Sequence, residues 1–201
     1  MTIVVTGGIG SGKSAVCGIL RDVYGIPVYE ADSRVKKLYD DFPGLLEQVE
    51  IVVCRKLRDV EGRFMPSVLA DVIFNDSDKL AEVEALVFPA LKADYAGWKK
   101  EHDSVHHVFE SATLLEKPQF DGFGDIVLLV DAPFGLRLER AAVRDARPRD
   151  LIMQRMMNQK LMNRLSEGDS DPRIDHVIIN DGTVQELEVK VAEFMKNYRL
   201  T

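Results

Sequence analysis

Short apolar runs alternate with longer amphipathic segments along most of the chain. The short runs are rich in Val and Ile and predict buried strands at 2–5, 26–32, 105–110, 125–131 and 176–180. Apolar residues recur at helical spacing at 14–25, 134–145, 150–165 and 184–197. A strand, a glycine loop, a helix and a second strand fill the first 32 residues, which is the order of a βαβ unit. The pattern therefore predicts an α/β fold with a five-stranded parallel sheet flanked by helices.

The segment 33–102 has a different pattern. It is mostly helical in period, and turn-forming stretches such as "DFPG" and "EGRFMP" interrupt it. Residues 48–57 also fit a strand, so that alternative stays open for them. We expect a core of residues 1–32 and 103–201, with a helical insertion at 33–102. The stretch "ARPRD" breaks the helical pattern near residue 147 and predicts a small lid at about 141–158.

Each predicted strand ends in, or is followed by, a residue suited to ligand binding. These residues are Gly7, Asp32, Glu110, Asp131 and Asn180. The carboxyl ends of parallel strands meet at one edge of the sheet, which is where open α/β folds bind ligands. We therefore expect the site at this edge.

Composition excludes several classes of protein. The 201 residues carry a net charge of −7, whereas a general nucleic-acid surface requires a basic excess. The two cysteines, Cys17 and Cys54, make no disulfide framework or metal-ligand pair. No apolar run reaches the roughly 18 residues needed to cross a bilayer, and the first apolar stretch lacks the features of a signal peptide. We expect a cytoplasmic enzyme with no nucleic-acid or membrane partner.

The stretch "GGIGSGKS" fits the phosphate-loop pattern G-x-x-x-x-G-K-[ST] from Gly7 to Ser14. Such a loop wraps phosphates with backbone N–H groups, and the following helix adds the positive end of its dipole. Lys13 is predicted to bridge the β- and γ-phosphates, and the Ser14 hydroxyl to bind Mg²⁺. The residues predicted to bind the nucleotide, ATP or GTP, are Gly8, Ile9, Gly10, Ser11, Gly12, Lys13, Ser14 and Ala15.

The loop leaves the phosphoryl acceptor open between water, a protein and a small-molecule hydroxyl. The chain has no N-K-x-D stretch, which a regulatory GTPase uses to read guanine. The run "LLVD" at 128–131 is compatible with the second nucleotide motif of a motor or transport ATPase. The small size and the helical insertion favour a small-molecule kinase.

Two carboxylates are candidates for the chemistry. Asp32 follows the second strand and can orient an acceptor hydroxyl and take its proton; the alternative is that it caps the next helix. Glu110 ends the third strand and can hold a water on Mg²⁺, or it is a solvated strand end. Spacing alone does not decide between these alternatives.

Arg140 and Arg144 are spaced i, i+4, so both lie on one face of the predicted helix at 134–145. Such a pair can clamp the γ-phosphoryl group as charge develops on it. The alternative is a solvated helix whose arginines pair with Glu139 and Asp145.

Taken together, these segments resemble the dephospho-CoA kinase family along nearly the whole chain. The resemblance is carried by "TGGIGSGKS", "VYEADSRVKKL", "GRFMPSVLADVIFND", "ESATLLE", "RLERAAVRD", "QRMMNQ" and "DHVIIND". It implies a P-loop kinase fold in which ATP, with Mg²⁺, phosphorylates the 3′-hydroxyl of the ribose in dephospho-CoA.

The resemblance also implies roles for single residues. Asp32 would be the base near the 3′-hydroxyl, Arg140 a lid arginine on the phosphates, and Asn180 a neighbour of the adenine of ATP. The insertion would bind dephospho-CoA, and the chain would be a monomer or a small homo-oligomer. Another nucleoside or nucleotide kinase, or a nucleotide-dependent switch protein, stays open as an alternative.

The chain departs from the family pattern at a few positions. The first Asp of the family's Asp-Ala-Asp is Glu30 here, and the family's His-Pro is Phe88-Pro89. The Pro-Leu-Leu turn appears as Ala112-Thr113-Leu114. None of these changes affects Lys13, Ser14 or Asp32.

Overall fold

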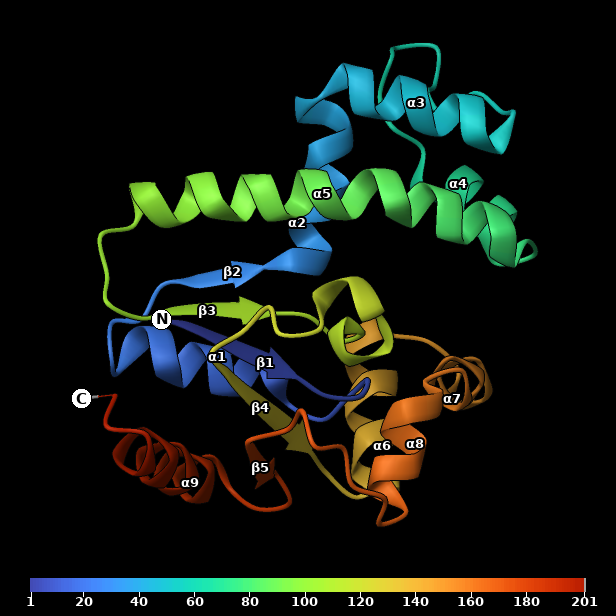
Figure 1. The fold of residues 1–201 in the computed structure, drawn as a ribbon. Helices are drawn as coiled ribbons and strands as arrows, with labels where there is room; N and C mark the ends of the chain where they lie inside the picture. The colour runs from blue at the N-terminus through green and yellow to red at the C-terminus, as the bar shows by residue number, and fades with distance from the viewer. Residues whose placement is uncertain (201) are drawn as a thin grey trace. The chain divides into compact units, whose positions relative to one another are not determined.

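A computed structural model of the chain describes residues 1–200 and divides into two compact units. The first unit consists of Met1–Glu30 together with the residues from Ser104 onward, and the second is Ala31–Asp103. Figure 1 shows the course of the chain through both units. The first unit contains the sheet and the phosphate loop, and the second is helical.

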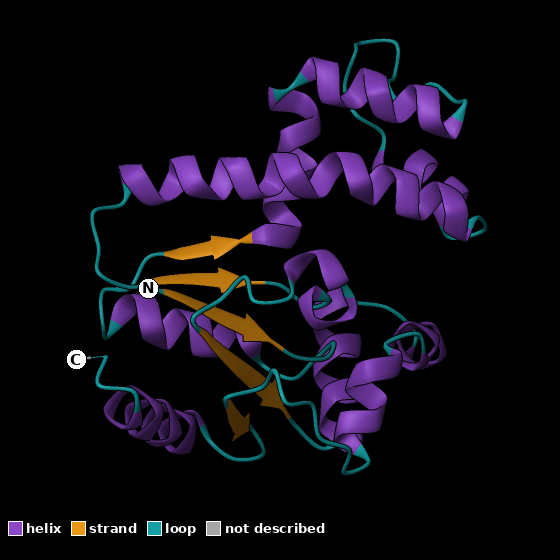
Figure 2. Ribbon diagram, viewed as in Figure 1, coloured by secondary structure: helices purple, strands orange, loops and turns teal. Residues whose placement is uncertain are grey.

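The sheet of the first unit has five strands within the described residues, in the order β2-β3-β1-β4-β5. They are β1 (Thr2–Thr6), β2 (Val28–Glu30), β3 (His107–Glu110), β4 (Ile126–Asp131) and β5 (His176–Ile179). All four pairings between neighbouring strands are parallel, so the carboxyl ends share one edge (Figure 2). β1 lies between β3 and β4, with Val5 opposite Glu110 and Thr6 opposite Leu129. The predicted five-stranded parallel sheet is confirmed.

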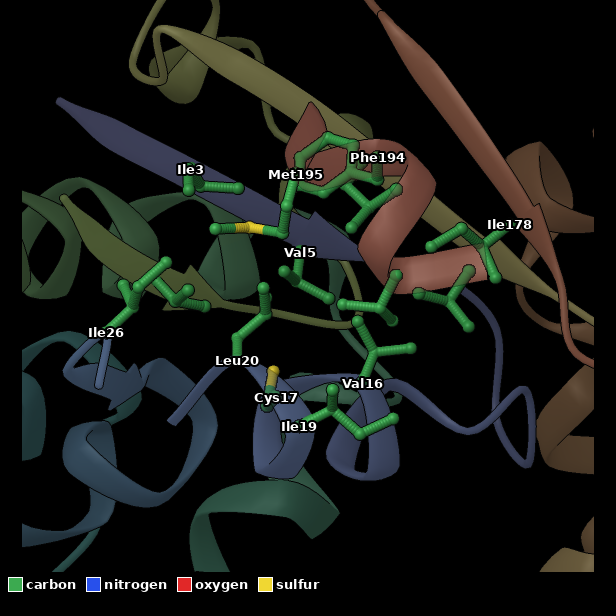
Figure 3. Close-up of a cluster of buried hydrophobic side chains, with 14 of the residues drawn as sticks. Ile3, Val5, Val16, Cys17, Ile19, Leu20, Ile26, Ile178, Phe194 and Met195 are labelled. Atoms are coloured by element: carbon green, nitrogen blue, oxygen red, sulfur yellow. The ribbon is translucent and has the colours of Figure 1, made fainter. Parts of the chain in front are cut away.

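One face of the sheet is covered by α1 (Lys13–Asp22) and α9 (Val184–Asn197). Alternate residues of β1, Ile3 and Val5, point into this core, as the period of two along a strand requires. They pack there with Val16 and Leu20 of α1, and with the side chains of α9 (Figure 3). This burial fixes the start of α1 against the end of β1, and so fixes the loop between them.

The opposite face is covered by the segment between β3 and β4. Two short 3₁₀ turns, η1 (Leu114–Glu116) and η2 (Pro118–Phe120), lie in this segment. The ring of Phe109 on β3 contacts Phe120 and Phe123 at centroid distances of 6.0 and 4.8 Å. This aromatic cluster and the core formed with α1 and α9 together bury the central strands on both faces, as expected for a parallel sheet.

Between β4 and β5 the first unit has three helices: α6 (Phe134–Asp145), α7 (Arg149–Met157) and α8 (Lys160–Ser166). We call these three helices together the α6–α8 segment. It has a small core of its own, made by Ala141, Ile152 and Met156.

The second unit contains α2 (Ala31–Asp41), α3 (Pro43–Val53), α4 (Pro66–Ile73) and α5 (Ser77–Glu101). Its core is built from apolar side chains of all four helices, including Tyr39, Val49, Leu69 and Val87. Arg34 of α2 makes a bidentate ion pair with Asp94 of α5, with both N–O distances at 2.7 Å. No helix in residues 1–200 is both long enough and apolar enough to cross a membrane.

The structure corrects three details of the sequence interpretation. The strand expected at 26–32 ends at Glu30, because the backbone turns into α2 at Ala31. Residues 48–53 belong to α3, in which Leu46, Val49 and Val53 are buried at helical spacing, so the strand alternative is wrong there. The single helix expected at 150–165 is two helices. Gln159 lies between them, and its backbone is not helical, with a ψ of 73°. Its buried side chain contacts Ile9 of the phosphate loop.

Candidate active site

The phosphate loop connects β1 to α1 in a conformation that only glycine adopts without strain. Gly7, Gly10 and Gly12 have φ values of 148°, 77° and 100°. There is also no room for side chains: a Cβ on Gly7 would overlap the carbonyl oxygen of Val130, and one on Gly12 would overlap the amide of Asn180. The loop is therefore fixed both by its own backbone and by the strands beside it.

Several carbonyl groups of the loop accept hydrogen bonds from side chains around it. Lys13 Nζ donates to Gly7 O at 3.0 Å, Arg137 Nε to Ile9 O at 3.2 Å, and Asn180 Nδ2 to Ser11 O at 2.9 Å. In a trans peptide the C=O group and the N–H group of the next residue point in opposite directions. Fixing these carbonyls therefore orients the N–H groups of Gly10 and Gly12 away from Arg137 and Asn180.

The N–H groups of Gly10, Gly12 and Ser14 have no acceptor among residues 1–200. They lie at or just before the N-terminus of α1, where unpaired donors and the helix dipole together attract anions. The loop thus presents a set of donors with no protein partner at the start of a helix. This arrangement fits the phosphates of a nucleotide.

Lys13 and Glu110 lie close together at the carboxyl edge of the sheet. Lys13 Nζ is 3.8 Å from Glu110 Oε1, and their side chains are only 11% and 13% exposed. The Ser14 side chain is exposed on the next residue of α1. A cation, a carboxylate and a hydroxyl are therefore available to a nucleotide bound in the loop.

The same residues fit a bound Mg²⁺. Mg²⁺ takes oxygen ligands and is usually held by one or two protein groups together with substrate phosphates and waters. Residues 1–200 contain no cluster of three or more His, Cys, Asp or Glu side chains that could hold a metal by themselves. A hydroxyl from Ser14 and a carboxylate from Glu110 agree with a magnesium ion that binds together with the nucleotide.

Two predicted site residues, Asn180 for binding the nucleotide and Arg140 for catalysis, bond to the loop or to its support. Asn180, just after β5, is buried, and its amide makes the bond to Ser11 O. Arg140 of α6 donates from Nη1 to the carbonyl oxygen of Asn180 at 2.9 Å. Their predicted contacts with adenine and the phosphates stay predictions.

The other two predicted residues have different surroundings. Arg144 is exposed and pairs with its neighbour Asp145 at 2.7 Å, an arrangement that matches the alternative of a solvated helix face. Ala15 lies in the first turn of α1, and its N–H group bonds to Gly12 O at 3.0 Å. A phosphate contact from Arg144 stays a prediction.

Asp32 is the second residue of α2 and has an exposed side chain in the first turn of that helix. The helix begins one residue earlier, so Asp32 is not the residue that caps it. One residue of chain separates Asp32 from Glu30, the last residue of β2. Its role as the catalytic base stays a prediction.

Two residues that contact the loop, Arg137 and Gln159, were not predicted from the sequence. Arg137 is fully buried and contacts Ile9, Asp131 and Ser166. Gln159 accepts a hydrogen bond from Ile9 N at 2.8 Å. Arg137 stands in an arginine-rich stretch that also contains Arg140, and only its burial distinguishes it; no sequence signal shows that burial.

A comparison with known proteins identifies the family. A family model described as dephospho-CoA kinase matches residues 1–186. The chain is 37% identical over 180 residues to the dephospho-CoA kinase of Porphyromonas gingivalis, and the match covers 90% of this chain and 86% of that protein. Its fold is similar to the crystal structure of TT1252 from Thermus thermophilus, with a TM-score of 0.83, 26% identity, and coverage of 100% and 98% of the two chains.

A dephospho-CoA kinase structure from Campylobacter jejuni has the same fold. It has a TM-score of 0.64 and 19% identity, and the match covers 98% of this chain and 96% of that one. The family model spans the phosphate loop, the helical unit, the α6–α8 segment and β5. The chain belongs to the dephospho-CoA kinase family.

Proposed function

We propose that this chain transfers the γ-phosphoryl group of ATP to the 3′-hydroxyl of the ribose in dephospho-CoA, the last step in making coenzyme A. The observation that carries the proposal is the family match along residues 1–186. The loop supports it, because its N–H donors without acceptors and the cation of Lys13 suit a nucleoside triphosphate.

The chain's own groups act mainly by position and charge. Lys13 and the N–H groups of Gly10, Gly12 and Ser14 bind the β- and γ-phosphates. Lys13 leaves its bond to Gly7 O to do so, because a phosphate oxygen is the stronger acceptor. As the bond between the γ-phosphorus and its bridging oxygen breaks, charge develops on the β-phosphate. Lys13 is placed to stabilise that charge.

Ser14 and Glu110 would hold Mg²⁺, Ser14 directly through its hydroxyl and Glu110 through a water. When bound, the ion would supply positive charge to offset the negative charge of the phosphates. Glu110 Oε1 also lies 3.8 Å from Lys13 Nζ, so Glu110 is placed to hold the ammonium group at the edge of the sheet.

The 3′-oxygen of the acceptor forms a bond to the γ-phosphorus, and Asp32 accepts the proton that this hydroxyl loses. ADP leaves with the bridging oxygen. A carboxylate can take this proton, and the exposed position of Asp32 leaves it accessible to an acceptor. Arg140 stabilises the transferring group from the α6–α8 segment.

The helical unit Ala31–Asp103 binds dephospho-CoA, as the family resemblance implies. Phe88 stands where the family has His, and a phenyl ring makes no hydrogen bond, so we give this position no part in binding the acceptor. A cytoplasmic location, the absence of nucleic-acid and membrane partners, and a monomeric or small homo-oligomeric state complete the proposal.

An acceptor panel tests the function. ADP release is measured with ATP and Mg²⁺ against dephospho-CoA, nucleoside monophosphates and deoxynucleosides. We expect rapid turnover with dephospho-CoA and little with the others. Turnover of another acceptor without turnover of dephospho-CoA would replace this proposal by another small-molecule kinase. Nucleotide binding without any acceptor would replace it by a switch protein.

The base is tested with Asp32→Asn, and Asp40→Asn, an exposed residue of the same helix, is the matched control. We expect Asp32→Asn to lower kcat by about 10²–10⁴-fold, the usual contribution of a general base. The KM for ATP should change little, and the control should behave like the wild type. A near-normal kcat in Asp32→Asn would show that the base is another group.

A further inference from the structure

Ile9, at the tip of the phosphate loop, is held at three points by the α6–α8 segment. Its N–H donates to Gln159 Oε1 at 2.8 Å, and its carbonyl oxygen accepts from Arg137 Nε at 3.2 Å. Its side chain packs on the core of Ala141, Ile152 and Met156. Both peptide groups and the side chain of one loop residue are therefore bound by residues of α6 and α7 and of the connection between α7 and α8, far away in the sequence.

Arg137 cannot move easily from this position. It has no solvent exposure, and its Nη1 bonds to Asp131 Oδ1 at 3.3 Å and to Ser166 Oγ at 3.1 Å. The Ser166 hydroxyl in turn donates to Asp131 Oδ2 at 2.9 Å. The guanidinium thus connects the loop to the end of β4 and to the last residue of α8.

The loop is shaped around this arginine. A Cβ on Gly8 would overlap Arg137 Nη2, and a Cβ on Gly10 would overlap the carbonyl oxygen of Arg137. Gly8 does not have a positive φ, so the backbone itself would accept a side chain there. The reason for a glycine at position 8 is therefore the space that the Arg137 guanidinium occupies.

Ile9 accepts a hydrogen bond from Arg137 through its carbonyl group and donates one to Gln159 through its N–H group. Arg137 holds the carbonyl of Ile9, so the N–H of Gly10 in the same peptide points away from Arg137. Gln159 holds the N–H of Ile9, so the carbonyl of Gly8 points away from Gln159. In this orientation the Gly8 carbonyl oxygen accepts a hydrogen bond from Ser11 N at 3.2 Å and lies 3.5 Å from Lys13 Nζ. Together the two side chains set the orientation of two successive peptides.

We propose that Arg137 and Gln159 are positioning residues that fix the peptides on either side of Ile9 and so direct the Gly10 N–H and Lys13 toward the triphosphate. Through the same contacts, the α6–α8 segment and its Arg140 keep their position relative to the loop. Neither residue touches the reacting atoms. The proposal rests on the phosphoryl transfer proposed above, and it adds the residues that hold the donor side of the site in shape.

A double-mutant cycle on the full chain tests the role of Arg137. The affinity for a non-hydrolysable ATP analogue is measured by calorimetry without any acceptor. In the otherwise unchanged chain, we expect Gly8→Ala to weaken binding of the analogue about 100-fold. In an Arg137→Gln background the same substitution should weaken binding less than about threefold, because the effects of substitutions at contacting residues are not additive. An equal loss in both backgrounds would contradict the proposal. A chain that binds the analogue but does not phosphorylate dephospho-CoA contradicts only the proposed function.

Gln159→Leu tests the second contact without disturbing the buried ion pair. Gln154→Leu, an exposed position in α7, is the matched control. We expect Gln159→Leu to lower kcat about tenfold or more, since small misplacements of reacting groups cost that much. The KM for dephospho-CoA should stay within about twofold of the wild type. An unchanged kcat, or an equal fall in the control, would overturn the assignment.

Discussion

The two strands that flank β1 both end in an acidic residue, and the two residues have different surroundings. Glu110 at the end of β3 lies 3.8 Å from Lys13 Nζ, beside the start of α1. Asp131 at the end of β4 is bound by Arg137 at one oxygen and by Ser166 at the other. In the sequence both are the acidic last residue of an apolar strand.

The difference between the two comes from the elements that pack against each strand end. The α6–α8 segment follows β4 and supplies a buried arginine and a hydroxyl, which use both oxygens of Asp131. Glu110 lies instead beside Lys13 in the first turn of α1, with 3.8 Å between Oε1 and Nζ. We therefore propose that Glu110 serves the nucleotide and its metal ion, whereas Asp131 supports the loop through Arg137.

The largest expected effect comes from removing the cation beside Glu110. Lys13→Ala should lower kcat/KM by about 10³–10⁴-fold, equal to about 4–5 kcal/mol of transition-state stabilisation. Lys196→Ala, an exposed lysine of α9, is the control and should leave the rate unchanged. Steady-state kinetics checks both. A loss below about tenfold for Lys13→Ala would contradict our assignment of the loop.

Asp131→Asn should act mainly on stability. It leaves the Arg137 guanidinium buried without its counter-ion, and breaking a buried ion pair costs about 3 kcal/mol. Burial already lowers the pKa of Arg137, and the charge of Asp131 opposes that shift. Urea unfolding measures the loss, with the exposed Asp150→Asn as control. An unchanged stability with a large loss of kcat would instead make Asp131 the residue that serves the metal ion.

Glu110→Gln should act mainly on the rate. We expect kcat to fall by about 10–100-fold at low Mg²⁺ and to recover in part as Mg²⁺ is raised, with little change in Tm. Glu139→Gln, exposed on α6, is the control. A large fall in Tm with an intact rate would reverse the roles that we give to the two acids.

The sequence allowed the fold and the donor loop to be predicted because both depend on local patterns. Strand periodicity, the glycines of the loop and the Lys13-Ser14 pair are all visible in short stretches. The α6–α8 contacts with the loop were not predictable, because Ile9 is about 130 residues distant from Arg137 in sequence. The same limit explains why the helix at 150–165 was expected to be continuous. At its break, Gln159 bonds to Ile9, which short-range patterns do not reveal.

A third acid shows that ion pairs which support structure also occur away from the sheet edge. Asp171 accepts from Arg173 at 2.9 and 2.6 Å, and Arg173 holds the pKa of Asp171 below its usual value. A carboxyl group whose pKa is lowered by folding stabilises the fold at pH values above its unfolded-state pKa of about 3.9. This stabilisation is lost as the pH falls through the lower pKa of the folded state.

Asp171→Asn should therefore cost about 1 kcal/mol or less at neutral pH, because the pair is partly solvated. The difference from the wild type should shrink as the pH falls below about 4, where the unfolded chain begins to bind the proton, and should vanish below the lower folded-state pKa of Asp171. Urea unfolding at both pH values measures this, and kcat at neutral pH should not change. A difference that grows on acidification would contradict the assigned pair.

The identity and amount of the product test the central claim most directly. The chain is incubated with ATP, Mg²⁺ and dephospho-CoA, and the product is examined by ³¹P NMR and by comparison with authentic coenzyme A. We predict one ADP formed for each coenzyme A, with the new phosphate on the 3′-oxygen. Release of inorganic phosphate without coenzyme A, or a phosphate on any other oxygen, would contradict the account.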